Sequence, residues 1–533
     1  MNNNNGPVVL VVAPDKSLPQ GLSTKDFLGR MPNIGVLYLA AALEANGQRC
    51  VVLDRQHCSV SPLQLAVEIN THKPSLVGFT LYDVTMESTR QTLSILRLLY
   101  KGAVVVGGYT PTFHAKEILQ RWNDVDYVVV REGEKAIVAL TEHLNGARTI
   151  QNVPNLVYRQ DEQIQMNPED NLVDVNSIPW PKREWPEPGD VTPIVSRRGC
   201  LSRCTFCSMV PFYDLRLGPI VRTRNPSNVV DEITYCVDHG STEFMFYDDD
   251  FGLSSKAERE WCAQFLDCAR KRGVKFHWGV ELRVTDVIRG ESLLRDLCEV
   301  GLTHISIGME SLLPRQLKLY GKGYKQDDVF KAVEIARTLP LDFQTNVIFW
   351  DPWLTLEEAV EHVELLDQIR IQDQLGSANF PFHSGLLIAR RGTKLHSLLA
   401  AAEMLQQRSG NFYEYDYDFV DRRVAAFHKG AFFKFLARAH AVVRPAALWL
   451  FVPRIEHAGQ LEIASAYRRY ARTIAHAEFE YFRALVTAAC HNVDPVESER
   501  LADRIHAEFG PQIDRCADLL PVLSSRHVAV AVN

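Results

Sequence analysis

Three cysteines within eight residues are the most informative feature of the sequence for chemistry. They lie in the segment Arg198-Gly199-Cys200-Leu201-Ser202-Arg203-Cys204-Thr205-Phe206-Cys207. Thiolates spaced by four and then three residues on one loop can bind three irons of a four-iron cubane and leave the fourth iron open for chemistry. A structural zinc site is the alternative, but a closed zinc site needs four ligands. The nearest further candidates, Cys236 and His239, fall in a predicted helix.

Carboxylates follow the strands that come after this loop. Asp248, Asp249 and Asp250 end one predicted strand, and three adjacent carboxylates need a cation or hydrogen-bond donors to offset their repulsion. An acidic cap at a helix N-terminus is the alternative explanation. The next two strands are followed by Glu281 with Arg283, and then by Glu310. The order of these groups after successive strands indicates one site at one end of a sheet or barrel.

Two series of short apolar strands alternate with helices and must position these groups. The first series predicts a doubly wound parallel sheet, covered by helices on both faces. Ligands of such sheets bind at the carboxyl ends of the strands, which is where Gly107 and Gly108 fall. Its predicted strands are Val8 to Ala13, Cys50 to Asp54, Ser75 to Thr80, Val104 to Val106 and Tyr127 to Val130.

The second series has six candidate strands, which fit a partial (β/α)6 barrel similar to a TIM barrel. They are Pro193 to Ser196, Glu243 to Tyr247, Lys275 to Val280, His304 to Ile307, Asp342 to Phe349 and Leu375 to Phe380. We therefore expect an α/β protein with a first domain at 7–145, a polar, proline-rich linker at 146–190 and a barrel at 191–400. Beyond about residue 395 the pattern, including Glu414 to Tyr417, predicts a helical region, 401–533, with no further strand series.

Composition excludes several classes of function. A formal net charge of −7 and a pI near 6.2 give no basic face for nucleic acid. No apolar stretch approaches the 18 residues or so of a transmembrane helix. The 11 cysteines are an odd number and favour metal binding over a disulfide framework, so we expect a cytoplasmic protein.

The cysteine loop resembles the Cys-x3-Cys-x2-Cys signature of the radical S-adenosylmethionine (SAM) superfamily, with aromatic Phe206 before the last cysteine. The resemblance implies that Cys200, Cys204 and Cys207 bind a [4Fe-4S] cluster and that SAM chelates the open iron. It further implies a set of SAM contacts. These are Phe206 beside the adenine, together with Asp248, Asp249, Glu281, Arg283 and Glu310.

The first domain is similar to the cobalamin-binding, Rossmann-like domain that precedes the barrel in one branch of this superfamily. The matching segments are Pro32 to Ala41, Val77 to Thr80, Val106 to Thr112 and Arg131 to Glu134. The segment Ala13 to Ser17 lacks an Asp-x-His-x-x-Gly motif, which implies cobalamin bound without a protein histidine below the cobalt. The predicted cobalamin contacts are Thr80, Tyr82, Gly107, Gly108, Tyr109, Glu132 and Gly133.

Together the two resemblances imply a C-methyltransferase that acts on an unactivated carbon of a small-molecule or natural-product intermediate. A 5′-deoxyadenosyl radical would abstract a substrate hydrogen, and methylcobalamin would supply the methyl group. Oxidation, cyclisation or rearrangement without methylation is an open alternative. So, from another class, is a non-catalytic corrinoid or iron–sulfur redox sensor. The resemblance also implies an electron donor such as flavodoxin or ferredoxin. The aromatic segment Phe427 to Phe451 would pack on the barrel, with contact to a membrane surface as the alternative.

Overall fold

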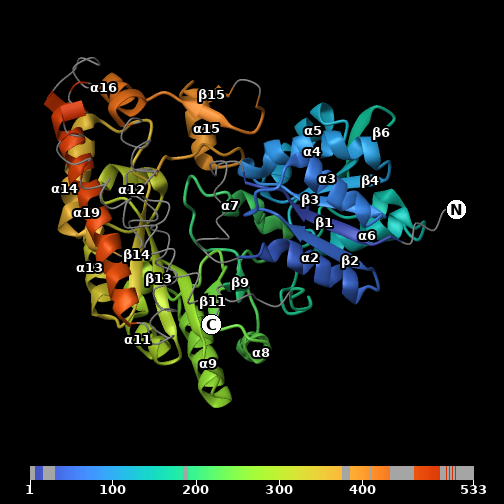
Figure 1. Cartoon of the computed structure of the whole chain (residues 1–533), viewed down its shortest axis with the longest axis horizontal. Helices are drawn as coiled ribbons and strands as arrows, with labels where there is room; N and C mark the ends of the chain where they lie inside the picture. The colour runs from blue at the N-terminus through green and yellow to red at the C-terminus, as the bar shows by residue number, and fades with distance from the viewer. Residues whose placement is uncertain are drawn as a thin grey trace.

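The computed structural model describes residues 6–15, 31–183, 190–374, 385–408, 411–432 and 461–491, with a few single positions beyond residue 499. Figure 1 shows the first domain beside the barrel, with the short helix α7 (Met209–Phe212) near their junction. This arrangement confirms the predicted α/β class. The sixth predicted strand, 375–380, and most of the segment from Phe427 to Phe451 lie outside the described residues.

The first domain contains a parallel sheet with the strand order β2-β1-β3-β4-β5. Its strands are β1 (Val8–Val12), β2 (Cys50–Asp54), β3 (Leu76–Thr80), β4 (Ala103–Gly107) and β5 (Tyr127–Val129). Every residue of β1 is buried, as expected for a strand with helices on both faces. In this order, the topological switch point for ligand binding falls between β1 and β3.

Five helices cover the two faces of this sheet. Alternate residues point to opposite faces, so Val8 and Leu10 pack in one core and Val9 and Val11 in the other. The first core contains residues of α2 (Ile34–Ala45) and α6 (Glu134–Leu144). The second contains residues of α3 (Pro62–Thr71), α4 (Met86–Leu99) and α5 (Tyr109–Arg121).

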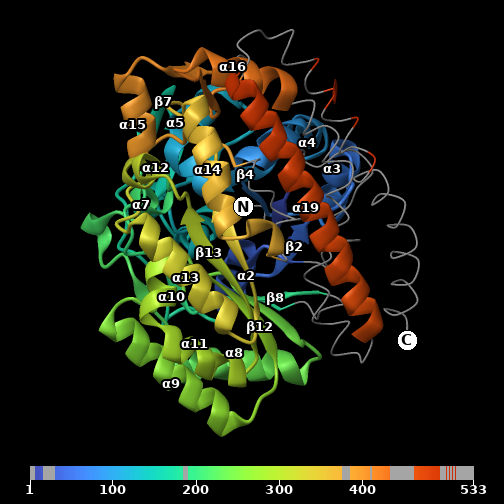
Figure 2. The ribbon, with the colours of Figure 1, turned by 90° about the vertical axis from the view of Figure 1, so that its left-hand side faces the viewer.

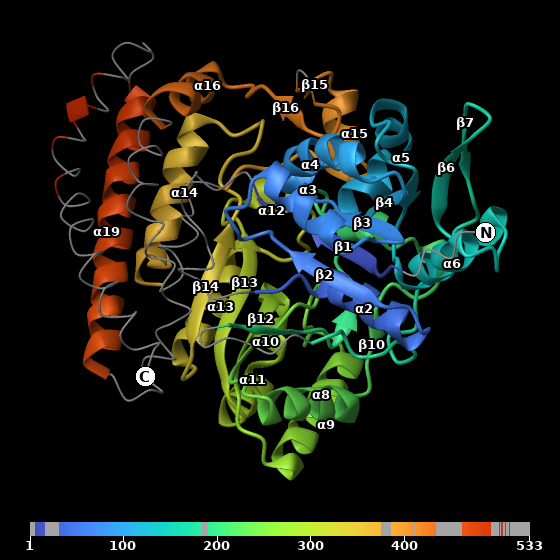
Figure 3. The ribbon, with the colours of Figure 1, turned by 45° about the vertical axis from the view of Figure 1, so that its right-hand side comes forward.

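The predicted linker is partly a regular structure. Strands β6 (Leu156–Gln160) and β7 (Gln163–Met166) form an antiparallel hairpin that extends the sheet beyond β5 (Figure 3). Its turn uses Asp161 and Glu162, both with positive φ, which the prediction did not recognise as a hairpin turn. The structure thus places a sheet hairpin inside the segment expected to be irregular, and the domain limits themselves stay a prediction.

The second domain has five described parallel strands in the order β14-β13-β12-β11-β8. They are β8 (Thr192–Ile194), β11 (Glu243–Phe246), β12 (His277–Arg283), β13 (Leu302–Glu310) and β14 (Asp342–Val347). The helices that alternate with them are α8 (Pro226–Asp238), α9 (Lys256–Arg272), α10 (Val284–Arg289), α11 (Glu291–Glu299), α12 (Pro314–Tyr320), α13 (Gln326–Thr338) and α14 (Leu356–Gln368). This part matches the predicted partial barrel over the strands that the structure describes.

Helix ends in the barrel follow local sequence signals. Helix α9 begins after Ser255, which forms a capping box with Glu258, and it ends at Gly273 in the left-handed region. Helix α14 begins with the same device, made by Thr355 and Glu358. The long helix α19 (Leu461–His491) packs against α14 on the outside of the barrel (Figure 2).

The prediction of a helical pattern over Glu414 to Tyr417 is wrong, because two short strands lie in this region. Strands β15 (Leu405–Gln407) and β16 (Tyr415–Tyr417) pair antiparallel after α15 (Lys394–Ala401). Tyr415 and Tyr417 pack on a small apolar cluster, whereas Asp416 forms an ion pair with Arg408, which is the period-two pattern of a strand. Helix α16 (Arg422–Phe427) and a π turn, His428–Phe432, follow. No helix among the described residues is long and apolar enough to cross a membrane.

Candidate active site

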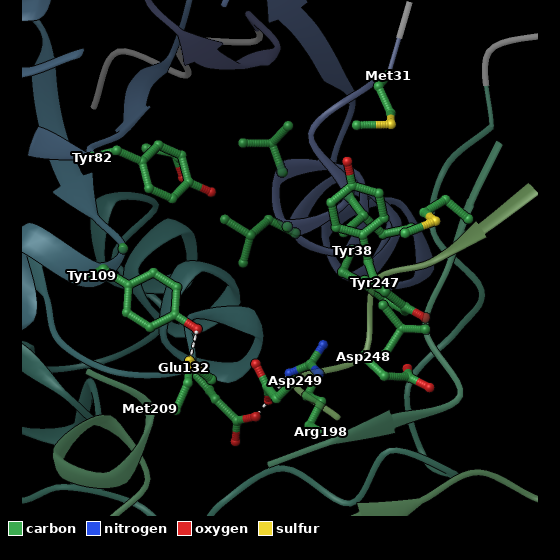
Figure 4. Close-up of a pocket in the computed structure, with 18 of the residues that line it drawn as sticks. Met31, Tyr38, Tyr82, Tyr109, Glu132, Arg198, Met209, Tyr247, Asp248 and Asp249 are labelled. Carbon is green, nitrogen blue, oxygen red and sulfur yellow. Dashed lines mark hydrogen bonds and ion pairs between the residues drawn. The ribbon is translucent and has the colours of Figure 1, made fainter. Parts of the chain in front are cut away.

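A cavity of about 960 Å³ lies between the carboxyl edge of the first sheet and the barrel (Figure 4). All seven predicted cobalamin contacts line it: Thr80, Tyr82, Gly107, Gly108, Tyr109, Glu132 and Gly133. The barrel contributes four predicted residues to the same lining: Cys207, Asp248, Asp249 and Glu281. Five predicted residues are not part of the lining, namely Cys200, Cys204, Phe206, Arg283 and Glu310. The structure thus brings the two predicted sites to one space.

The wall from the first domain is largely apolar. It runs between the sheet and helices α2 and α6, and its lining includes Leu10, Leu39, Gly78, Val105, Val129 and Ile137. Gly108 has φ +109°, and a Cβ there would lie 3.1 Å from the carbonyl oxygen of Leu81. A side chain at this position would be strained and would crowd the end of β4. The wall fits a large ligand held by shape and backbone groups, as a corrin with its nucleotide tail would be.

The cysteine loop begins at Gly199, where the backbone has a conformation that favours glycine. Gly199 has φ +89°, and a Cβ there would lie 2.1 Å from the carbonyl oxygen of Ile220. Its N–H donates to Asp249 over 2.6 Å. Within the loop, the N–H of Ser202 donates to the sulfur of Cys200 over 3.4 Å, and that of Met209 donates to Cys207 over 3.5 Å. Donors of this kind stabilise thiolates that bind a cluster.

The three adjacent aspartates contact the cysteine loop and the residues that lead into it. Asp248 accepts the N–H groups of Ser196, over 2.7 Å, and Arg197, over 3.0 Å. Asp250 forms an ion pair with Arg283 over 2.9 Å and lies 3.7 Å from the sulfur of Cys200. The helix-cap alternative is wrong for this segment, because α9 begins at Lys256.

Burial raises the pKa of both Asp248 and Asp249 to about 6. Asp248 accepts two backbone N–H groups just after β8, so the structure gives it partners other than SAM. The Oδ1 atom of Asp250 is buried and accepts no hydrogen bond from a described residue. That orphaned acceptor next to Cys200 fits a site that takes a further donor.

The charges around the cysteines fit a set of metal-binding thiolates. Burial raises the pKa of Cys200 to about 12, with Asp250 as a second cause, and burial raises the pKa of Cys204 as well. The free thiols are therefore protonated, and metal binding would release their protons. Lys322 and Arg283 supply the nearby positive charge, since both favour the thiolate form of Cys204.

Two further predicted residues meet near Cys204. Lys322 forms an ion pair with Glu310 over 3.2 Å, and its ammonium lies 5.9 Å from the ring centre of Phe206. Glu310 ends β13 with φ +65°, a strained backbone position for a residue other than glycine. Lys322 was not predicted from the sequence; it lies in the short connection between α12 and α13.

The described part of the chain gives little support to a structural zinc site. Cys236 is buried in the barrel core, and no three His, Cys, Asp or Glu side chains among the described residues could hold one metal ion. A cubane has a different requirement, because each thiolate binds its own iron.

Tyr247, Met31 and Tyr38 line the cavity but were not predicted as contacts from the sequence. Figure 4 shows Tyr247 on the side of the barrel and the predicted residues Tyr82 and Tyr109 on the side of the first domain. Tyr247 follows β11 and is 42% exposed, although its neighbours Phe246 and Asp248 are buried. Alternation along the strand was the signal that could have identified it, since Phe246 belongs to the core. Tyr38 lies in the segment Pro32 to Ala41 that carried the resemblance but was not singled out, and no local pattern marks Met31.

Comparison with known proteins agrees with this geometry. Residues 24–141 match the B12 binding domain family, and residues 194–366 match the radical SAM superfamily. The chain belongs to the B12-binding radical SAM enzymes. Both matches fall on the domains that share the cavity, so the recognition made from the motifs is confirmed.

The relatives include enzymes of more than one reaction type. The chain is 30% identical to the anaerobic magnesium-protoporphyrin IX monomethyl ester cyclase of Cereibacter sphaeroides, over 58% of this chain and 52% of the cyclase. It is 23% identical to the hopanoid C-3 methylase of Methylococcus capsulatus, over 62% of this chain and 63% of the methylase. The chain thus spans only about half to two thirds of the length of these curated relatives.

A solved structure shares the whole architecture. The cobalamin-dependent SAM radical enzyme OxsB, with aqua-cobalamin and SAM bound, aligns with a TM-score of 0.71 at 16% identity. The alignment covers 98% of this chain and 80% of OxsB. At this identity the likeness shows the fold. The cofactors of a B12-binding radical SAM enzyme are a [4Fe-4S] cluster, SAM and cobalamin, and the two walls of the cavity fit them.

Proposed function

We propose that this enzyme is a cobalamin-dependent C-methyltransferase that acts on an unactivated carbon of a small-molecule or natural-product intermediate. The observation that carries the proposal is the shared cavity, whose walls are the carboxyl edge of the first sheet and the cysteine side of the barrel. A substrate in that space would be within reach of both cofactor sites. Relatives named as methyltransferases support the reaction type.

In this proposal the three cofactors, when bound, supply a hydrogen-abstracting radical and a methyl group. Cys200, Cys204 and Cys207 hold the cluster, and Asp249 and Glu281 face the cavity where the cationic groups of SAM would lie. The bound SAM would be supported further by three residues outside this lining, namely Phe206, Arg283 and Glu310. The chain's own task is to bind, orient and exclude water from reactive species.

The cavity lining favours a substrate without a phosphate or carboxylate as its anchoring group. The cations of the described lining are Arg131, Arg197 and Arg198, and each is already in an ion pair with a carboxylate of this chain. An anionic substrate would have to break one of these buried pairs. An apolar or neutral polar substrate would not. We further propose a cytoplasmic electron donor such as flavodoxin or ferredoxin.

The test begins with anaerobic reconstitution with iron, sulfide and hydroxocobalamin, followed by desalting. We expect about one corrin and four irons per chain. Dithionite and SAM should then give both 5′-deoxyadenosine and S-adenosylhomocysteine. S-adenosylhomocysteine shows that a methyl group has left SAM.

Other results would support the alternatives. Bound corrin and 5′-deoxyadenosine without S-adenosylhomocysteine, on any substrate tried, would favour oxidation or cyclisation, and the magnesium-protoporphyrin relative is named a cyclase. Bound cofactors with neither product would favour a redox sensor. Iron without corrin would remove the cobalamin step altogether.

A further inference from the structure

One loop of the cobalamin domain contacts both ends of the cysteine loop. Residues Arg131 to Glu134 follow β5 and lead into helix α6. Their side chains reach Arg198, two residues before Cys200, and the segment from Phe212 to Asp214, which begins five residues after Cys207. These contacts cross from one cofactor site to the other.

The contact before the cysteines is a buried cluster of ion pairs. Arg198 binds Glu132 over 2.9 Å and Glu134 over 2.5 Å, and its side chain is only 13% exposed. Arg222, on the strand that pairs with the segment at Arg198, binds Glu132 over 2.8 Å. The guanidinium of Arg198 also lies over the ring of Tyr38, 5.1 Å from its centre. Charged pairs with this much burial have a defined geometry, because moving either partner leaves an unpaired charge.

The contact after the cysteines involves a backbone carbonyl, a carboxylate and a sulfur atom. Arg131 donates to the carbonyl oxygen of Phe212 over 2.5 Å and lies 3.6 Å from the carboxylate of Asp214. Arg131 itself has φ +62°, so its backbone is held in a strained conformation. Close by, the hydroxyl of Tyr109 donates to the sulfur of Met209 over 2.7 Å, as the dashed line in Figure 4 shows.

We infer that the loop Arg131 to Glu134 is a positioning element that sets the place of the cluster relative to the cobalamin. Glu132 was predicted to contact cobalamin, but its two oxygens are occupied by Arg198, Arg222 and the N–H of Val173. Glu134 likewise has its carboxylate on Arg198. The loop therefore acts through the cysteine loop. This inference rests on the proposed reaction, in which both cofactors serve one substrate.

The variant Glu134→Gln tests the inference with little change in shape. It removes one of the two charges on Arg198 and leaves Glu132 in place. The matched control is Lys135→Met, which removes an ion pair at the next residue of the same helix. The Lys135–Asp170 pair is exposed, at 53% and 35%, and does not touch the cysteine loop. Each protein is reconstituted with cobalamin and cluster and reduced with dithionite.

The readout is the spin–spin interaction between cob(II)alamin and the reduced cluster in electron paramagnetic resonance. We expect Glu134→Gln to retain both cofactors but to show a weakened or broadened interaction. We also expect several-fold more 5′-deoxyadenosine per S-adenosylhomocysteine than in the wild type. Lys135→Met should match the wild type in both measurements. A role in folding alone would lower the yield of protein and leave the interaction unchanged.

A second variant covers the case in which Glu134→Gln loses a cofactor. Arg198→Lys keeps the positive charge but cannot bind both carboxylates in the same fork. An interaction identical to the wild type, in whichever variant retains both cofactors, would overturn the inference. A wild type with the interaction but without S-adenosylhomocysteine would contradict the proposed methyl transfer and leave the positioning role standing.

Discussion

The two walls of the cavity are built on different physical principles. The wall of the first domain consists largely of apolar side chains and glycine backbone at the carboxyl edge of a parallel sheet. The wall of the barrel combines apolar side chains with carboxylates and arginines, and these charged groups form ion pairs and bind the backbone of the cysteine loop. One wall is suited to select a ligand by shape, and the other is suited to hold charge at fixed positions.

The difference indicates what each cofactor needs from the protein. A large ring ligand needs a close-fitting surface, which side chains of low polarity provide at little desolvation cost. A cluster with a labile cationic cosubstrate needs thiolates and carboxylates whose charges are compensated. A substitution in one wall should therefore impair the binding of its own cofactor and leave the other cofactor bound.

The largest effect is expected from Cys204→Ala on the barrel wall. Loss of one thiolate removes a ligand of the cluster, so we expect loss of the iron–sulfur absorbance and of all 5′-deoxyadenosine formation. Cobalamin retention should stay within about two-fold of the wild type, because the first-domain wall is unchanged. Iron content, corrin content and product formation measure the three effects.

Cys58→Ser is the control for this substitution. Cys58 lies in the loop after β2, where its N–H donates to the carbonyl oxygen of Arg55, and its substitution should leave iron content unaltered. Cleavage of SAM by Cys204→Ala protein under reducing conditions would contradict the assignment of the cluster ligands. Loss of corrin together with iron would break the comparison, since it would show that the two walls are not independent.

The next effect is expected from Gly108→Ala on the wall of the first domain. The substitution strains a backbone at φ +109° and places a Cβ 3.1 Å from the carbonyl oxygen of Leu81. Strain of this kind costs about 1–3 kcal/mol, which corresponds to roughly 5- to 150-fold weaker cobalamin binding if it is relieved by moving the wall. Corrin retention after desalting should fall while iron content stays the same.

Gly146→Ala is a matched control, because Gly146 also has a positive φ, +79°, but has no atom within 4 Å of the added Cβ. It should lower the thermal midpoint by a few degrees and keep cobalamin. Equal loss of corrin in both variants would show that general destabilisation, and not the shape of the wall, explains the effect of Gly108→Ala.

The fold of both domains was predictable because their strands are apolar runs between turn signals. Every strand from β1 to β5 lies at a predicted position, and so do the five described barrel strands. The hairpin β6–β7 was missed because its second strand, Gln163–Met166, is mostly exposed and carries no apolar run. Strand β16 was missed because aromatic residues fit helices and strands alike over three positions.

The candidate site was predictable in its parts but not in its connections. The cysteine motif and the strand ends gave the residue types. The partners of Glu132 and Asp248 were not predictable, because they depend on how two chain segments far apart in the sequence pack against each other. A single sequence records local spacing, and an ion pair between domains has no local signature.

The smallest effect is expected from the protonation of Glu281, a carboxylate of the barrel wall that faces the cavity and has no hydrogen bond to a described residue. Burial raises its pKa, and nearby Glu310 raises it further. A raised pKa means that acidification removes the negative charge at a higher pH than for an ordinary glutamate. Affinity for the cationic SAM should therefore fall as the pH decreases through this raised pKa, by roughly ten-fold if one charged contact is lost.

Glu281→Gln should show the weaker affinity at every pH and lose this part of the pH dependence. The control Glu260→Gln alters an exposed residue on α9 and should behave as the wild type. The measurement is SAM binding to the cluster-loaded enzyme by anaerobic dialysis between pH 5 and pH 8, with cobalamin retention followed in the same samples. Cobalamin retention should not change over this range, because the wall of the first domain is largely apolar. A parallel fall in both affinities would mean that the charge on the barrel wall also controls the cobalamin wall, and that the two walls act as one unit.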